Sequence, residues 1–202
     1  ISAYERAIEI NPKLVEAFLN LGILYNKMTQ FDDAIPILEN AIEISPNNAT
    51  TWLALGDAQK GAGDQGKAID AYNKVLQIDS GYTPAYARLA AAYKNLQQWD
   101  KAIENYQQAI ALEPDIALGY LGLSTIKNLE QDKQLIEVME QKYQDPGTSL
   151  QNLIHFSFAL GKAHADLANY EKSFDYFQRG NQLRGDSLQY DVNQEIEFFE
   201  KL

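Results

Sequence analysis

The sequence predicts an all-α protein made of stacked pairs of antiparallel helices. The main observation is a period of 34 residues that separates equivalent aromatic residues, equivalent leucines and equivalent prolines along the chain. The aromatic position is held by Phe18, Trp52, Tyr86 and Tyr120, and the leucine position by Leu21, Leu55, Leu89 and Leu123. A fixed period of this length is typical of solenoids, in which each unit buries its apolar face only against its neighbours. Such proteins present an extended surface rather than an enclosed cavity for chemistry.

Each period contains two amphipathic helices. In residues 15–48 the first apolar stripe runs from Phe18 to Tyr25 at helical spacing, and a second stripe runs from Ala34 to Ile42. Pro46 ends the second helix, because proline is not accommodated in a helix interior. Two such helices joined by a short turn form an antiparallel hairpin.

The period divides the whole chain into units. Residues 117–153 are expected to form a degenerate unit, because Lys127, Ile136 and Glu140 replace its tyrosine, its alanine and its second aromatic residue. A final helix is expected to cover the apolar end of the stack with Ile196, Phe198, Phe199 and Leu202. The expected units are 1–14 (the second helix of a truncated pair), 15–48, 49–82, 83–116, 117–153, 154–187 and 188–202 (the capping helix).

The pattern of the third unit resembles the tetratricopeptide repeat. The residues that carry the resemblance are Tyr86, Leu89, Ala90, Tyr93, Ala102, Tyr106, Ala109 and Pro114. The resemblance implies a single domain, a right-handed α–α superhelix of about five helix pairs with a C-terminal capping helix. It also implies a non-catalytic scaffold that binds a peptide or protein segment in a concave groove.

A narrower resemblance covers roughly the last 50 residues of the chain. His155-Phe156, residues 159–163, Ser173-Phe174 and Tyr190-Asp191 are similar to the end of the repeat region in bacterial proteins that join such repeats to a sulfotransferase domain. This resemblance implies the alternative function, a regulatory or substrate-presenting arm of a sulfotransferase whose catalytic domain lies downstream. It transfers no catalytic residue to this chain.

Composition excludes several classes of function. Seventeen basic and 28 acidic residues give a net charge of −11, which disfavours binding to nucleic acid and to anionic membranes. The chain has no cysteine, so it can form neither disulfides nor a thiolate metal site, which fits a reducing compartment such as the cytoplasm. The longest apolar run, residues 116–123, is too short to span a bilayer.

Two motifs that could suggest chemistry are better explained by structure. Gly61, Gly63 and Gly66 match a phosphate-binding pattern, but they fall at the turn between two predicted helices instead of after a strand. His155 and His164 are nine residues apart, and His164 occupies a packing position usually held by tyrosine. The sequence therefore predicts no catalytic residue, no metal site and no cofactor.

The first helix of each pair is expected to line the binding surface. Lys27, Lys60 and Lys94 would follow one edge of an apolar strip and could attract an acidic peptide or a carboxylate, although lysines at helix ends also favour the helix dipole and solubility. A third possibility is self-association through the ends of the solenoid. The expected surface residues are Leu19, Ile23, Asn26, Lys27, Leu53, Asp57, Lys60, Ala87, Arg88, Ala91, Lys94 and Leu121.

Overall fold

The computed structural model describes the backbone of residues 1–200 and the side chains of residues 1–187. These residues form eleven α-helices and no strand, which confirms the all-α prediction. The chain divides into two compact units, Ile1–Gln108 (unit 1) and Ala109–Leu202 (unit 2).

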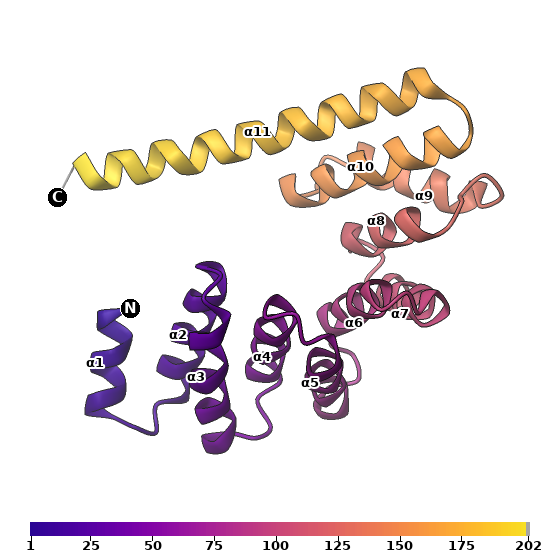
Figure 1. The fold of residues 1–202 in the computed structure, drawn as a ribbon. Helices are drawn as coiled ribbons and strands as arrows, with labels where there is room; N and C mark the ends of the chain where they lie inside the picture. The colour runs from indigo at the N-terminus through magenta and orange to yellow at the C-terminus, as the bar shows by residue number, and fades with distance from the viewer. Residues whose placement is uncertain (201–202) are drawn as a thin grey trace. The chain divides into compact units, whose positions relative to one another are not determined.

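Unit 1 is a row of helices in which each one from α1 to α5 packs against the next (Figure 1). Helix α2 also contacts α4, as expected when first helices of successive pairs lie next to each other. The helices are α1 (Ser2–Ile10), α2 (Val15–Lys27), α3 (Phe31–Ile44), α4 (Ala49–Gly61), α5 (Gln65–Ile78), α6 (Thr83–Asn95) and α7 (Trp99–Leu112), of which α7 continues into unit 2.

The turn within each hairpin uses one residue in the left-handed region. Thr29, Gly63 and Gln97 have φ values of 58°, 91° and 58° and are separated by one period each. The next residue then donates a backbone N–H to the carbonyl five residues earlier, for example from Asp64 N to Gln59 O at 2.9 Å. This bond satisfies a carbonyl that the helix end would leave unpaired. Of the three glycines in the phosphate-loop pattern, only Gly63 takes a positive φ, so the turn interpretation is confirmed.

Glycine in the first helix allows the two helices of a pair to approach closely. A Cβ atom on Gly22 would lie 2.5 Å from the side chain of Leu38, and one on Gly56 would lie 2.4 Å from the ring of Tyr72. Both neighbours come from the second helix of the same pair, and both are fully buried. The glycine positions therefore set the spacing within the hairpin.

The repeated aromatic residue of the first helix joins each pair to the preceding one. Trp52 Nε1 donates to Pro46 O at 2.7 Å, and Tyr86 Oη donates to Ser80 O at 3.1 Å. In unit 2, Tyr120 Oη donates to Pro114 O at 3.0 Å. The period thus repeats a hydrogen bond as well as an apolar contact.

Unit 2 is built from helices of unequal length, from 10 residues in α8 to 31 in α11. Its core contains Tyr120, Met139, Phe156 and Leu160. Helix α10 begins earlier than the expected boundary at residue 154, because Ser149 Oγ accepts the backbone N–H of Asn152 at 3.3 Å and caps the helix. Beyond the end of α7, the helices of this unit are α8 (Ala117–Ile126), α9 (Lys133–Gln144), α10 (Leu150–Asp166) and α11 (Tyr170–Glu200).

The end of the chain differs from the expected separate capping helix. Helix α11 is continuous for 31 residues, so residues 188–200 prolong the second helix of the last pair (Figure 1). No proline follows Pro146 in the sequence, so nothing comparable to Pro46 stops this helix. The capping role expected of Ile196, Phe198, Phe199 and Leu202 concerns side chains outside the described residues.

Candidate partner-binding surface

Side-chain hydrogen bonds join the first helices of unit 1 to one another. Asn26 Nδ2 in α2 donates to Ala54 O in α4 at 2.9 Å. Asp57 in α4 pairs with Arg88 in α6, whose Nε lies 2.7 and 2.8 Å from the two carboxylate oxygens. We call the side chains that accompany these bonds the first-helix face: Leu19, Ile23, Asn26, Lys27, Asp57, Lys60, Arg88, Ala91 and Lys94.

Asp57 is the centre of a polar group on this face. Besides Arg88, it accepts a hydrogen bond from Tyr72 Oη at 2.8 Å, so three helices meet at one carboxylate. Burial raises the pKa of Tyr72, and the neighbouring Asp57 raises it further. The side chains of Asp57 and Arg88 are about 30% exposed, and each charge is compensated by the other. Arg88 is therefore a positioned, neutralised cation and not an isolated positive charge.

Two of the expected surface residues are buried in the structure. Leu53 and Ala87 are only 8% and 2% exposed, so they belong to the packed interior and the expectation that they line the surface is wrong. Leu53 packs with the cluster around Tyr72 and Val75. Leu121 lies in unit 2 and packs against the core of that unit.

The remaining expected residues differ in exposure. Leu19 and Ile23 are half-buried against the cluster around Leu38, so each shows only part of its side chain. Lys27 is exposed, whereas Lys60 and Lys94 are half-buried. The face therefore combines a narrow apolar strip with lysines of unequal accessibility.

The two histidines have packing roles. His164 is 5% exposed, and its Nε2 lies 3.2 Å from Glu140 Oε1. Its ring stacks on Tyr176 with the ring planes 4° apart. His155 is half-buried, and burial lowers its pKa. No cluster of three or more His, Asp or Glu side chains within the described part of the chain could hold a metal ion.

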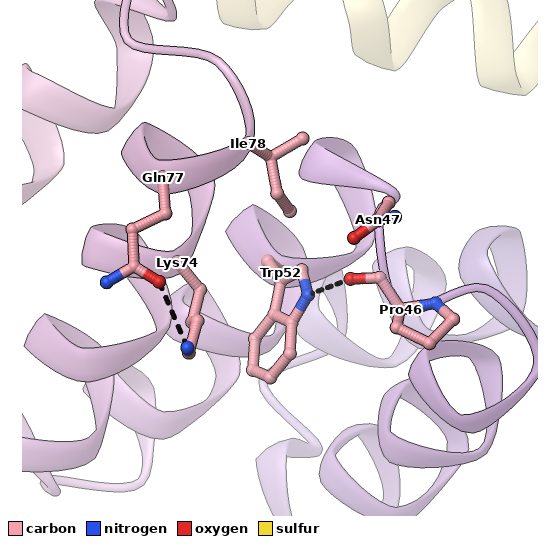
Figure 2. Close-up of a pocket in the computed structure, with 6 residues that line it drawn as sticks. All are labelled: Pro46, Asn47, Trp52, Lys74, Gln77 and Ile78. Atoms are coloured by element: carbon pink, nitrogen blue, oxygen red, sulfur yellow. Dashed lines mark hydrogen bonds between the residues drawn. The ribbon is translucent and has the colours of Figure 1, made fainter.

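A surface pocket in unit 1 was not anticipated from the sequence. It has a volume of about 590 Å³, and Figure 2 shows Trp52 in it, between the loop that follows α3 and the last turns of α5. All of the surface residues expected from the sequence belong to first helices, whereas half of the residues that line this pocket belong to the second helix α5. A position-by-position comparison of the periods could have indicated it. The lining residues are Pro46, Asn47, Trp52, Lys74, Gln77 and Ile78.

Comparison with protein families identifies the repeat. Residues 13–80 and residues 83–116 each match a family model of the tetratricopeptide repeat, and together these segments span about half of the chain. The chain therefore belongs to the tetratricopeptide repeat family. None of the curated protein sequences compared with this chain matches it.

Solved structures share the fold at low sequence identity. The Cut9–Hcn1 hetero-tetramer of the APC/C matches with a TM-score of 0.74 and 19% identity, over 89% of this chain and 35% of the other. The protein MamA matches with a TM-score of 0.59 and 24% identity, over 87% of this chain and 94% of the other. YrrB, described as a tetratricopeptide repeat protein with an unusual peptide-binding site, matches with a TM-score of 0.59 and 18% identity, over 96% and 98%. At such identities the likeness concerns the fold.

Within the described residues, no helix has the length and apolar character needed to cross a membrane.

Proposed function

We propose that this chain is a non-catalytic scaffold that binds a peptide or an extended protein segment across the first-helix face of unit 1. The observation that carries the proposal is the row of three first helices, joined by Asn26 and by the Asp57–Arg88 pair. These bonds hold the face in one arrangement before a partner arrives, which reduces the entropy cost of binding. The peptide-binding site attributed to YrrB, which has the same fold, supports the same class of function here.

The chemistry of the face favours a segment that carries both apolar and acidic side chains. Leu19 and Ile23 offer partly exposed apolar surface, and Lys27 and Lys60 offer positive charge beside it. Because Arg88 is neutralised by Asp57, its contribution is to shape and hydrogen bonding and not to net charge. Charge at the edge of a surface acts mainly on specificity and on the association rate.

Peptides selected against the purified chain from a random library would test this proposal. The double variant Lys27→Glu/Lys60→Glu is expected to weaken the selected peptides by roughly tenfold, the equivalent of about 1.4 kcal/mol. Lys13→Glu is the matched control, since Lys13 is an exposed lysine in the loop between α1 and α2. Equal affinity for the double variant and the parent chain, with folding intact, would contradict the proposal.

A second candidate rests on the resemblance of residues 155–191 to the repeat region of bacterial sulfotransferase fusions. In this alternative the chain is a regulatory or substrate-presenting arm that acts on behalf of a catalytic domain encoded after Leu202. The gene sequence beyond that residue tests the alternative. A strand followed by a phosphate-binding loop would support it, and any other continuation would remove it.

The proposal also concerns where the protein is located and whether it self-associates. We place the protein in the cytoplasm of a bacterium, on the basis of the missing cysteines and the sulfotransferase resemblance. Self-association through the helices at the ends of the two units is a further proposal. Light scattering over a range of concentrations tests it, and a constant monomer mass would exclude it.

A further inference from the structure

The pocket beside Trp52 has a rigid aromatic wall. The indole is fixed because its Nε1 donates to Pro46 O at 2.7 Å (Figure 2). Ile78, which is 37% exposed, supplies a second apolar surface on the same pocket. A positioned aromatic ring next to an aliphatic side chain can bury an apolar group of a ligand at low entropy cost.

The same pocket contains a lysine that lacks an acidic partner. Lys74 Nζ donates to the neutral amide oxygen of Gln77 at 3.0 Å. Among the described residues, no carboxylate oxygen lies within 4.0 Å of this ammonium group, although Asp70 lines the adjoining hollow. An ammonium group has three donors, so Lys74 can accept a further hydrogen-bonding partner.

Unit 2 shows what this lysine position binds when a carboxylate is available. Two periods after Asn47 and Lys74, the equivalent residues are Asp115 and Lys142. Lys142 forms an ion pair with Asp115, and this hydrogen bond raises the pKa of Lys142. In unit 1 the neutral Asn47 occupies the place of the aspartate, and the pocket remains open.

The surroundings of the two lysines share one hydrogen bond. The aromatic residue of the first helix donates to the carbonyl of a proline in both places, from Trp52 to Pro46 and from Tyr120 to Pro114. In unit 2 the carboxylate belongs to the residue directly after this proline, and Ile116 follows it. The ion pair of unit 2 thus shows that this lysine position accepts a carboxylate, and Trp52 and Ile78 offer apolar surface beside Lys74 in unit 1.

We propose that the Trp52 pocket is a second binding site, separate from the first-helix face, for an acidic side chain of a partner peptide flanked by an apolar residue. The ligand carboxylate pairs with Lys74, as Asp115 pairs with Lys142, and the adjacent apolar side chain packs on Trp52 and Ile78. A site of this kind on the second helices allows the scaffold to hold two segments at once, one on each surface.

The probe for this site copies residues 114–116 of the chain as the peptide acetyl-Pro-Asp-Ile-amide, and acetyl-Pro-Asn-Ile-amide serves as the uncharged control. Binding is followed by NMR through the indole N–H of Trp52, one of only two tryptophans in the chain, with Trp99→Phe used to assign the signal. We expect a saturable shift of this signal with the Asp peptide. The Asn peptide should bind about fivefold more weakly, the equivalent of ~1 kcal/mol for one partly exposed ion pair.

Two variants test the pocket, and one separates it from the first-helix face. Lys74→Met removes the charge but keeps the aliphatic stem, and Asn47→Asp supplies an internal carboxylate at the place of Asp115; each should weaken the Asp peptide about fivefold. Lys60→Met, a matched change on the first-helix face, should leave binding unchanged. The proposal is overturned if the indole signal does not saturate, if the two peptides bind equally, or if either pocket variant binds like the parent chain. An equal loss in Lys60→Met would place the peptide on the first-helix face and would also overturn it.

Discussion

The two units use the same repeat positions in different ways. The repeat has a position near the end of the first helix that is usually held by tyrosine. In unit 1 this position is Gln59 in α4 and Tyr93 in α6, and in unit 2 it is Lys127 and His164. Each unit 2 side chain has an acidic partner: Lys127 Nζ lies 2.7 Å from Asp132, and His164 lies 3.2 Å from Glu140. In unit 2 the polar residue at this packing position comes with an acidic partner, whereas the buried Gln59 of unit 1 keeps its amide oxygen without a hydrogen bond.

The second helices show the same contrast. Tyr72 in unit 1 is fully buried and is held by Asp57, while its counterpart Phe177 in unit 2 is half-buried and has no hydroxyl group. Glu140 takes this position in α9 and pairs with His164 instead of filling the space with a ring. The repeat therefore restricts the backbone geometry more strictly than it restricts the type of side chain at each position.

The largest effect should come from removing one fully buried leucine in each unit. Leu38→Ala and Leu160→Ala are each expected to cost about 3 kcal/mol of unfolding free energy, because both side chains are completely buried. Contacts in a solenoid are local, so each change should lower hydrogen-exchange protection mainly in its own unit. If either variant loses hydrogen-exchange protection evenly from α2 to α11, the two units unfold together, which would contradict this prediction.

High pH should act on the buried tyrosines of unit 1. Burial raises the pKa of Tyr106 from 10.0 to about 12, so the folded state resists ionisation that the unfolded chain undergoes freely. The stability gained from the neutral side chain is complete below about pH 10 and is lost as the pH rises through about 12, a loss of up to about 3 kcal/mol. Urea unfolding at pH values below 10 and near 12 measures this loss.

The control for this prediction is Tyr106→Phe, which removes the ionisable hydroxyl while keeping the ring. It should flatten the alkaline part of the stability curve. The equivalent position in the last pair of unit 2 is Phe177, which has no hydroxyl group. A curve that is the same in the variant and the parent chain would show that another group controls the alkaline transition.

One close-packed glycine in each unit, Gly56 in unit 1 and Gly161 in unit 2, should differ in its tolerance of a methyl group. A Cβ on Gly56 would lie 2.4 Å from Tyr72, which cannot move without breaking its bond to Asp57, whereas a Cβ on Gly161 would lie 2.8 Å from the ring of the half-buried Phe177. We expect Gly56→Ala to cost about 1–2 kcal/mol, since the strain exceeds the gain in helix propensity, and Gly161→Ala to cost less. Thermal unfolding of the two variants decides the order, and an equal or reversed order would contradict it.

The smallest effect concerns the two equivalent lysines. Lys142→Met should lower the melting temperature slightly, because the variant loses the ion pair with Asp115, and the difference should shrink at high salt. Lys74→Met should leave the melting temperature unchanged, because Lys74 has only the neutral partner Gln77. Calorimetry at low and high salt compares them, and a salt-dependent loss in Lys74→Met would mean that this lysine is already paired in the folded chain.

The sequence alone determined that the chain is all-α and is built from paired helices. The 34-residue period places Gly22, Gly56, Leu38 and Tyr72 correctly, because apolar side chains at helical spacing must be covered by a neighbouring helix. The turns are equally local, as Thr29, Gly63 and Gln97 hold the same conformation one period apart.

Only the tertiary structure decided which polar side chains meet and which apolar ones are hidden. Asp57 and Arg88 are 31 residues apart, and no local pattern indicates that their side chains pair across two helices. Leu53 and Ala87 were assigned to the surface from their position in the repeat, yet the neighbouring helices cover them. The open pocket at Trp52 is likewise visible only in the structure, where Lys74 lacks the carboxylate partner that Asp115 gives to Lys142. Periodicity fixes the face of a helix that must be buried, whereas ion pairs and pockets depend on distances of a few ångströms between helices, which the sequence pattern does not contain.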